Sequence, residues 1–251
     1  MSAVLRAAIL LAAGAAAGVV GSGGGITTLV SYPALLACGV PALAANIANL
    51  IAAAACWPGS ALASKRELRH RAPWLRRHLP VAAAGGVCGV ALLMSTTEKV
   101  FEDVVPFLVA AGALTLLASP RLTRAGAAGG GFSGFAVDLL ILPVTIYGGY
   151  FGAGSGVMLL AVMLITVDTR LPVANALKNM LIGATTALAA VTLIVLRPVD
   201  YGACIPLAAG MLIGSMAGPV AARRVPESLI RYTVALLGLG LAVLLWAGYG
   251  S

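Results

Sequence analysis

One lysine stands alone in a long apolar stretch of this sequence. The run Leu171–Leu196 holds no other charged residue, and Lys178 comes six residues after Pro172. A lysine at such depth costs about 3 kcal/mol to insert into a membrane, so its ammonium group must face a cavity or a partner. We predict that Lys178 neutralises a bound anion. The alternative is that its long side chain reaches back to the membrane surface.

Asparagines accompany this lysine on the same predicted helix face. Asn175, Lys178 and Asn179 are spaced i, i+3, i+4. Asn46 and Asn49 are spaced i, i+3 on a predicted helix of the first half of the chain. Side-chain amides that face one another could donate hydrogen bonds to the several oxygens of an oxyanion. They could equally join helices of a bundle, at under about 1 kcal/mol per bond. The sequence leaves both roles open.

Two glycine-rich strings interrupt the apolar sequence at matching places. Gly21-Ser-Gly-Gly-Gly25 is followed 131 residues later by Gly152-Ala-Gly-Ser-Gly156. A helix broken inside a membrane frees N–H and C=O groups that only protein or a water-filled cavity can satisfy. The start of a half-helix presents free N–H donors and partial positive charge, which together suit an anion. We therefore predict a substrate site at the two breaks, the alternative being tight helix packing. Its candidate residues are Gly21, Ser22, Gly23, Gly24, Gly25, Thr27, Thr28, Asn46, Asn49, Gly152, Gly154, Ser155, Gly156, Asn175, Lys178 and Asn179.

The composition places these residues in a membrane. Of the 251 residues, 61% are apolar and only 10% are charged, against roughly 25% in a typical soluble domain. So few charges could not cover the surface of a soluble protein of this length. The predicted class is an all-α polytopic membrane protein, which excludes a cytosolic enzyme, a disordered chain and a secreted disulfide scaffold. The net charge of +8 fits basic cytoplasmic loops better than nucleic-acid binding.

Apolar runs divide the chain into eight long segments and up to ten helical elements. The uncharged run Ala7–Ser64 corresponds to about 87 Å of helix, nearly three crossings of a 30 Å core. Breaks at Gly21–Gly25 and Gly39–Pro41 divide it into predicted helices over 4–20, 26–38 and 42–63. The later runs are Leu79–Thr97, Val104–Pro120, Phe132–Val167 with a break at Gly148–Gly156, Leu171–Leu196, Tyr201–Ala222 and Tyr232–Ser251.

Matching positions indicate that the chain consists of two related halves. The offset of 131 recurs between Pro41 and Pro172, and Asn49 precedes Asn179 by 130 residues. Two GxxxG pairs, which let helices approach closely, are also related, at an offset of 125. We predict one transmembrane repeat over 1–120, a cytoplasmic linker over 121–131 and a second repeat over 132–251. The GxxxG pairs are Gly85 with Gly89 and Gly210 with Gly214.

The basic residues indicate how the halves are oriented. The segment Lys65–His78 holds six Lys and Arg residues and should be cytoplasmic. If each glycine-broken segment crosses the membrane, the chain has eight spans and Arg223 and Arg224 fall outside. If each turns back, the halves have five elements each, and most of the remaining arginines fall inside. Five is an odd number, so the sequence favours inverted repeats, which are common in secondary transporters.

Motifs in both halves occur together in one known family. The second half holds Tyr147-Gly-Gly-Tyr-Phe-Gly-Ala-Gly154 and Asn175-Ala-Leu-Lys-Asn179, and the chain resembles the TauE/SafE family of sulfite-exporter-like transporters over nearly its whole length. The resemblance implies a bacterial inner-membrane secondary transporter that exports small anions such as sulfite or organosulfonates. The matching first-half motifs are Gly21-Ser-Gly-Gly-Gly-Ile-Thr27, Tyr32-Pro-Ala-Leu-Leu36, Gly39-Val-Pro41, Ala45-Asn46, Asn49, Pro58-Gly-Ser60 and Arg66-Glu-Leu68.

Asp138 is the only acidic residue in the apolar run Phe132–Val167. It could bind the proton that couples transport, pair with Lys178, or simply lie near the membrane surface. His70 and His78 fall in the basic segment and are expected to be solvated, close to anionic lipid headgroups.

Other function classes fit the residues less well. An anion channel of the same fold is the principal alternative to a carrier. Gly154-Ser155-Gly156 superficially resembles an intramembrane serine-protease motif, but no base is expected beside the serine. Neither glycine string continues as a Walker motif, so direct use of ATP is not expected. We expect no metal, no cofactor and no nucleic acid; the predicted partners are a small anion and membrane lipids, and the sequence leaves open whether the chain forms a homo-oligomer.

Overall fold

The protein is a bundle of helices, described here from a computed structural model that covers residues 2–125, 132–221 and 227–249. No strand occurs in these residues. Within these residues, six helical segments are long and apolar enough to cross a membrane, so the predicted all-α polytopic class is confirmed. The helices are α1 (Ala3–Gly24), α2 (Thr28–Ala37), α3 (Ala42–Ala53), α4 (Cys56–Ala63), α5 (Lys65–Leu68), α6 (Ala72–Ser95), α7 (Glu98–Ala125), α8 (Gly134–Tyr150), α9 (Ser155–Thr166), α10 (Leu171–Leu196), α11 (Tyr201–Ala221) and α12 (Glu227–Tyr249).

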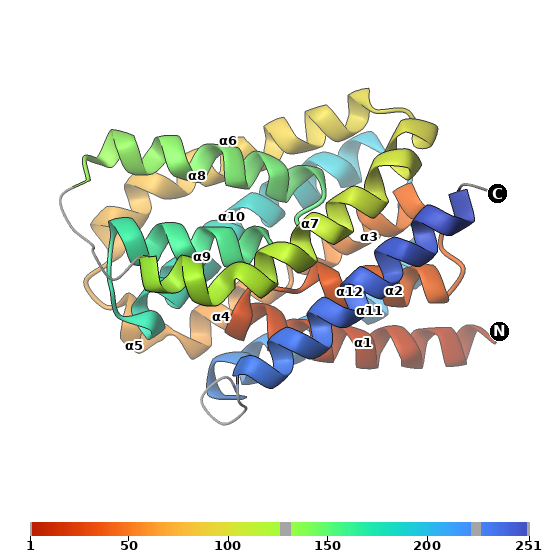
Figure 1. The fold of residues 1–251 in the computed structure, drawn as a ribbon, viewed down its shortest axis with the longest axis horizontal. Coiled ribbons are helices and arrows are strands. Elements are labelled where there is room, and N and C mark those ends of the chain that lie inside the picture. Colours follow the sequence, from red (N-terminus) through yellow and green to blue (C-terminus); the bar gives the residue numbers. More distant parts are fainter. Residues whose placement is uncertain (1, 126–131, 222–226, 250–251) are drawn as a thin grey trace.

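The chain turns back at each glycine break. Figure 1 shows α9 returning beside α8 in the opposite direction, and α2 returning towards the end where α1 begins. The start of α1 lies at one end of the molecule and α5 lies at the other (Figure 1). In the described residues this arrangement corresponds to ten main elements, with α3 and α4 counted as one and the four-residue α5 left out. The proposed inverted relation between the halves stays a prediction.

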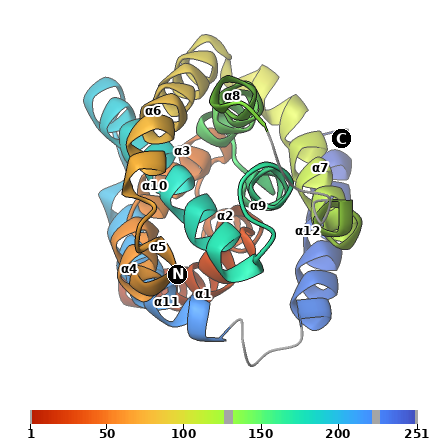
Figure 2. The same ribbon diagram turned by 90° about the vertical axis from the view of Figure 1, so that its left-hand side faces the viewer.

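The packing of the two halves is reciprocal. The first helix of each half, α1 or α8, lies along the fourth main element of the other half, α11 or α6. Viewed along the bundle, α2 and α9 occupy the centre, with these pairs and the α7–α12 pair around them (Figure 2). Both predicted GxxxG pairs lie at close helix contacts. A methyl group on Gly89 would collide with the Ile146 carbonyl oxygen of α8, and one on Gly214 with the Ala15 carbonyl oxygen of α1.

Three predicted helix boundaries differ from the structure. The first helix does not end at residue 20 but continues through Gly24, because side chains of α10 cap its last carbonyl groups. The helix predicted over 42–63 is interrupted at residues 54–55, where Pro58 cannot donate to the Ala54 carbonyl oxygen. The first part of the predicted linker, 121–125, continues α7, and 126–131 lies outside the described residues.

Ion pairs join the halves at both ends of the bundle. At the α5 end, the Asp168 carboxylate pairs with Arg71 and, at 2.8 Å, with Arg170. At the other end, Arg6 pairs with Asp200 at 2.7 Å. A side-chain hydrogen bond from Arg170 lowers the pKa of Asp168 from 3.8 to about 2. The carboxylate therefore stays charged over nearly the whole usable pH range.

Asp168→Asn is expected to lower the melting temperature of the detergent-solubilised protein by about 2–4 °C at neutral pH. Because the pKa of Asp168 is lower in the folded protein, its stabilising contribution is complete above about pH 4 and disappears as the pH falls to about 2. Thermal unfolding of wild type and variant across this range measures the difference. Asp103→Asn, at an exposed position of α7, is the control and should change little. A gap between wild type and Asp168→Asn that is undiminished at about pH 2 would contradict the assignment.

Candidate substrate site

The two glycine breaks meet backbone to backbone. Gly25 adopts a left-handed conformation, with φ at +78°, that ends α1. A methyl group on Gly25 would lie 2.6 Å from the carbonyl carbon of Gly156, and one on Gly156 would lie 2.5 Å from the Cα of Gly25. Neither position has room for a side chain. The two strings therefore form a single junction, at which the end of α1 contacts the start of α9.

Lys178 lies on α10 beside this junction and is fully buried. Its Nζ donates a hydrogen bond of 3.2 Å to the carbonyl oxygen of Gly21, in the last turn of α1. The backbone N–H of Gly25 donates to the same oxygen at 2.7 Å. The ammonium group is thus at the partially negative end of α1. This is not the exposed arrangement expected of a lysine that reaches the membrane surface.

The charge of Lys178 has no carboxylate partner in the described parts of the chain, where every ion pair involves other residues. Its hydrogen bond to Gly21 uses one of the three ammonium donors. A buried charge is strongly destabilising unless an opposite charge or several hydrogen bonds compensate it. Two of its ammonium donors therefore have no hydrogen-bond partner in the described residues.

Asparagines of each half cap the broken helix of the other half. Asn175 and Asn179 both donate through Nδ2 to the Ser22 carbonyl oxygen near the end of α1, each at 2.9 Å. Asn46 of α3 donates to the carbonyl oxygen of Tyr150, the last residue of α8, at 2.8 Å. In these hydrogen bonds the asparagines join helices of the bundle, which is one of the two roles that the sequence left open. Each amide has a second N–H with no hydrogen-bond partner in the described residues.

Asn49 has different partners from its predicted counterpart Asn179. Its Nδ2 donates to the Thr28 hydroxyl oxygen at 3.2 Å, and its Oδ1 accepts a hydrogen bond from the Ser31 hydroxyl. Both hydroxyls lie in the first turns of α2 and are buried. Asn49 and Thr28 thus order the start of α2, and neither lines a cavity described here.

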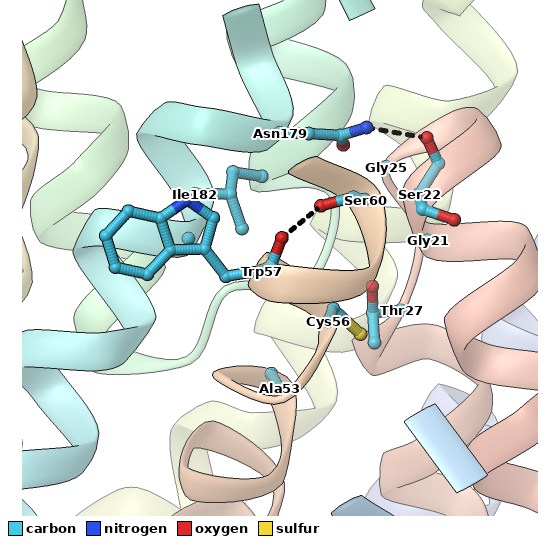
Figure 3. A pocket seen from close by; sticks show the side chains of 11 residues that line it. Gly21, Ser22, Gly25, Thr27, Ala53, Cys56, Trp57, Ser60, Asn179 and Ile182 are labelled. Carbon is cyan, nitrogen blue, oxygen red and sulfur yellow. Dashed lines mark hydrogen bonds between the residues drawn. The ribbon is translucent and has the colours of Figure 1, made fainter. Parts of the chain in front are cut away.

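A cavity of about 30 Å³ lies beside the first break (Figure 3). Five predicted residues line it: Gly21, Ser22, Gly25, Thr27 and Asn179. The space holds about two water molecules, so an oxyanion could enter only if the walls move. At the start of α2, the backbone N–H groups of residues 26 and 27 form no hydrogen bond within the described parts of the chain. They are the free donors predicted for a helix broken in the membrane.

A smaller cavity of about 10 Å³ lies beside the second break. Ser155 and Gly148 line it together with three threonines, and Ile182 borders both cavities. The Ser155 hydroxyl donates to the carbonyl oxygen of Gly152 at 2.8 Å. No hydrogen bond joins this serine to a histidine or lysine in the described residues. The threonines are Thr145, Thr185 and Thr186.

The remaining predicted glycines shape the backbone and line neither cavity. Gly152 and Gly154 adopt left-handed conformations, with φ at +81° and +78°, in the turn between α8 and α9. Gly154 also packs on α7, where an added methyl group would lie 3.0 Å from the Cα of Gly112. Gly23 and Gly24 complete the last turn of α1.

Asp138 pairs with His78 and not with Lys178. The Asp138 carboxylate lies 2.5 Å from the Nδ1 of His78, which is only 2% exposed. The expectation that His78 is solvated is therefore wrong. The basic segment is not a loop at this point: α6 begins at Ala72 and packs along α8, which buries the histidine against Asp138.

Three residues of α4 that line the larger cavity were not predicted: Cys56, Trp57 and Ser60. A signal was present in the proline and glycine that follow Trp57, since both disturb a helix inside an apolar run. The Trp57 indole packs beside Gly183 of α10, where a methyl group would collide with the ring. Only the fold brings α4 beside the junction.

Comparison with known proteins gives one match. The sequence model of the family described as Sulfite exporter TauE/SafE matches residues 6–245. The comparison with curated proteins and the comparison with solved structures found no match.

Proposed function

The chain belongs to the TauE/SafE sulfite exporter family, and on that premise we propose that it exports small sulfur-containing anions by alternating access at the junction of the two glycine breaks. The family is one of membrane transporters, so the coarse function is a membrane exporter of sulfite or related sulfur compounds. The proposed location is a bacterial inner membrane. The exact anion, the mechanism and the binding residues are our proposal.

One observation carries the choice of site, namely the buried ammonium of Lys178 without a carboxylate partner. A monoanion beside Lys178 would compensate its charge, and no carboxylate of the described residues does so. The neighbouring donors suit an oxyanion, because Asn179, with a second amide N–H, and Thr27, with a free backbone N–H, both line the larger cavity, which Lys178 adjoins through its hydrogen bond to Gly21. Sulfite and sulfonates offer three oxygens for such donors.

The burial of the site favours a carrier over the channel alternative. Lys178 is fully buried, and the adjacent cavity is too small for an oxyanion without movement of its walls. Such an occluded arrangement is a state through which an alternating-access carrier must pass. An open channel does not require an occluded state.

Transport by the purified protein in proteoliposomes tests the function. The assay compares sulfite, thiosulfate, sulfoacetate, taurine and sulfate as substrates. We expect saturable uptake of at least one of these anions, with counterflow when the same anion is loaded inside. Flux without saturation or counterflow would favour the channel, and no flux of any anion would refute the substrate class.

Cys56 reports where the transported anion binds, because its thiol lines the larger cavity. In a variant whose other three cysteines are alanine, we expect the transported anion to slow the reaction of Cys56 with a small methanethiosulfonate by at least about threefold, since both occupy one cavity. Mass spectrometry measures the modification. A second variant that retains only the exposed Cys88 is the control and should show no protection. Equal labelling of Cys56 with and without a saturating anion would contradict a site in this cavity.

A further inference from the structure

Each of the two reciprocal helix pairs, α1–α11 and α6–α8, is joined by an acidic and a basic side chain. These two side-chain pairs lie towards opposite ends of the bundle. Along α1 and α11, Arg6 near the start of α1 meets Asp200, which directly precedes α11, at 2.7 Å. Along α6 and α8, His78 meets Asp138 at 2.5 Å. In both cases the two partners come from different halves of the chain. The arginine pair keeps its charges at every physiological pH, whereas histidine changes charge between about pH 5 and 8.

The surroundings of His78 leave Asp138 as its main electrostatic partner. The helices packed most extensively on α6 and α8 are α9, which carries no titratable side chain, and α10, whose only titratable residue is Lys178 at the junction. Helix α7 also contacts α8, through the Leu108 carbonyl oxygen, and its charged residues lie near its two ends. On α6 itself, Arg76 and Arg77 precede the histidine, and the Arg77 guanidinium lies against Gly134 at the start of α8. The other face of the histidine ring is covered by the Trp74 ring, with centroids 4.3 Å apart. Tyr147 and Tyr150 lie at the far end of α8.

We propose that His78 and Asp138 form a proton-binding site that couples the proton to opening of the α6–α8 contact. With the proton bound, an imidazolium donates through Nδ1 to the carboxylate, and the two halves are held by a charge-assisted hydrogen bond. When the proton leaves, the imidazole is neutral and the contact is weaker. Because His78 is close to the α5 end, the proton is exchanged on the side of the basic segment. The coupling rests on the proposed transport function, but the proton-dependent contact itself does not.

The transport arm compares wild type with His78→Arg, which keeps a permanent positive charge at this position, and with His78→Gln, which has none. The ratio of variant to wild-type transport is measured at each pH from about 5 to 8, so that titration of the anion itself cancels. We expect each ratio to change by at least about threefold across this range, because only the wild type gains and loses a proton here. Arg6→Gln is the matched control at the other helix pair, and its ratio should stay constant.

Thermal unfolding in detergent tests the proton-binding site without transport. The melting temperature of wild type should exceed that of His78→Gln by a margin that grows as the pH falls from about 8 to 5, while the margin over Arg6→Gln stays constant. If the differences in melting temperature and the transport ratios are all independent of pH, His78 and Asp138 do not form a proton-binding site. If the difference in melting temperature between wild type and His78→Gln depends on pH but the transport ratios are constant, the pair binds a proton that is not coupled to transport. If wild type moves no anion, the transport proposal fails, and the unfolding data still decide whether the pair binds a proton.

Discussion

Lys178→Met is expected to abolish anion transport while leaving the protein folded. Methionine has nearly the length of lysine and no charge, so it fills the same buried space. The Gly21 carbonyl oxygen would keep its hydrogen bond of 2.7 Å from the Gly25 N–H, so no buried acceptor is left unpaired. Replacing a buried charge with an apolar group of similar volume is often neutral or stabilising. Transport should nevertheless fall by at least about 100-fold, since a buried charge pair with the anion is worth about 3 kcal/mol or more.

Initial rates in proteoliposomes and the melting temperature in detergent measure this expectation together. Lys99→Gln is the matched control, because it removes the same charge from an exposed position near the start of α7. It should leave both quantities nearly unchanged. A Lys178→Met protein that melts like wild type and still transports would show that the lysine only caps α1. The free N–H groups at the start of α2 would then be the main anion-binding groups.

Alanine at either glycine of the junction is expected to prevent stable folding. Gly156→Ala would place a methyl group 2.5 Å from the Cα of Gly25, against backbone that cannot move without shifting a helix. Gly25→Ala adds to a similar collision the cost of a left-handed conformation, about 1–2 kcal/mol. Overpacking alone costs about 1–3 kcal/mol. We therefore expect losses above about 3 kcal/mol for Gly25→Ala and slightly smaller ones for Gly156→Ala.

Two other glycines distinguish the two causes of that loss of stability, the collision and the left-handed backbone conformation. Gly39 also has a positive φ, of +77°, but has open space where a side chain would go, so Gly39→Ala should show the conformational cost alone. Gly24 has only one atom, 4.0 Å away, near an added methyl group, and Gly24→Ala should change the melting temperature little. Yield of monodisperse protein and thermal unfolding in detergent give the order. If Gly25→Ala and Gly156→Ala melt no lower than Gly39→Ala, the two breaks do not touch as described.

The sequence predicts the helices best where apolar runs end at charges. The helix over Leu171–Leu196 is confirmed to the residue, because Arg170 and Arg197 mark both limits of the run. Prediction from the sequence fails where a side chain that is distant in the chain determines the end of a helix. The extension of α1 to Gly24 depends on Lys178 and Asn179, which are more than 150 residues away in the chain.

The candidate residues divide in the same way. That Lys178 needs a cavity, a partner or a route to the membrane surface follows from its local sequence, because the cost of inserting a charge depends on the apolar segment around it. The partner of Lys178 does not follow from the local sequence, and neither does the pairing of Asp138 with His78. Each of these contacts joins helices from different halves of the chain. Local composition therefore determined the membrane class and most helix positions, and the sequence motifs determined the family resemblance. The tertiary structure decided which groups meet at the junction, since contacts between segments more than 100 residues apart depend on how the helices pack.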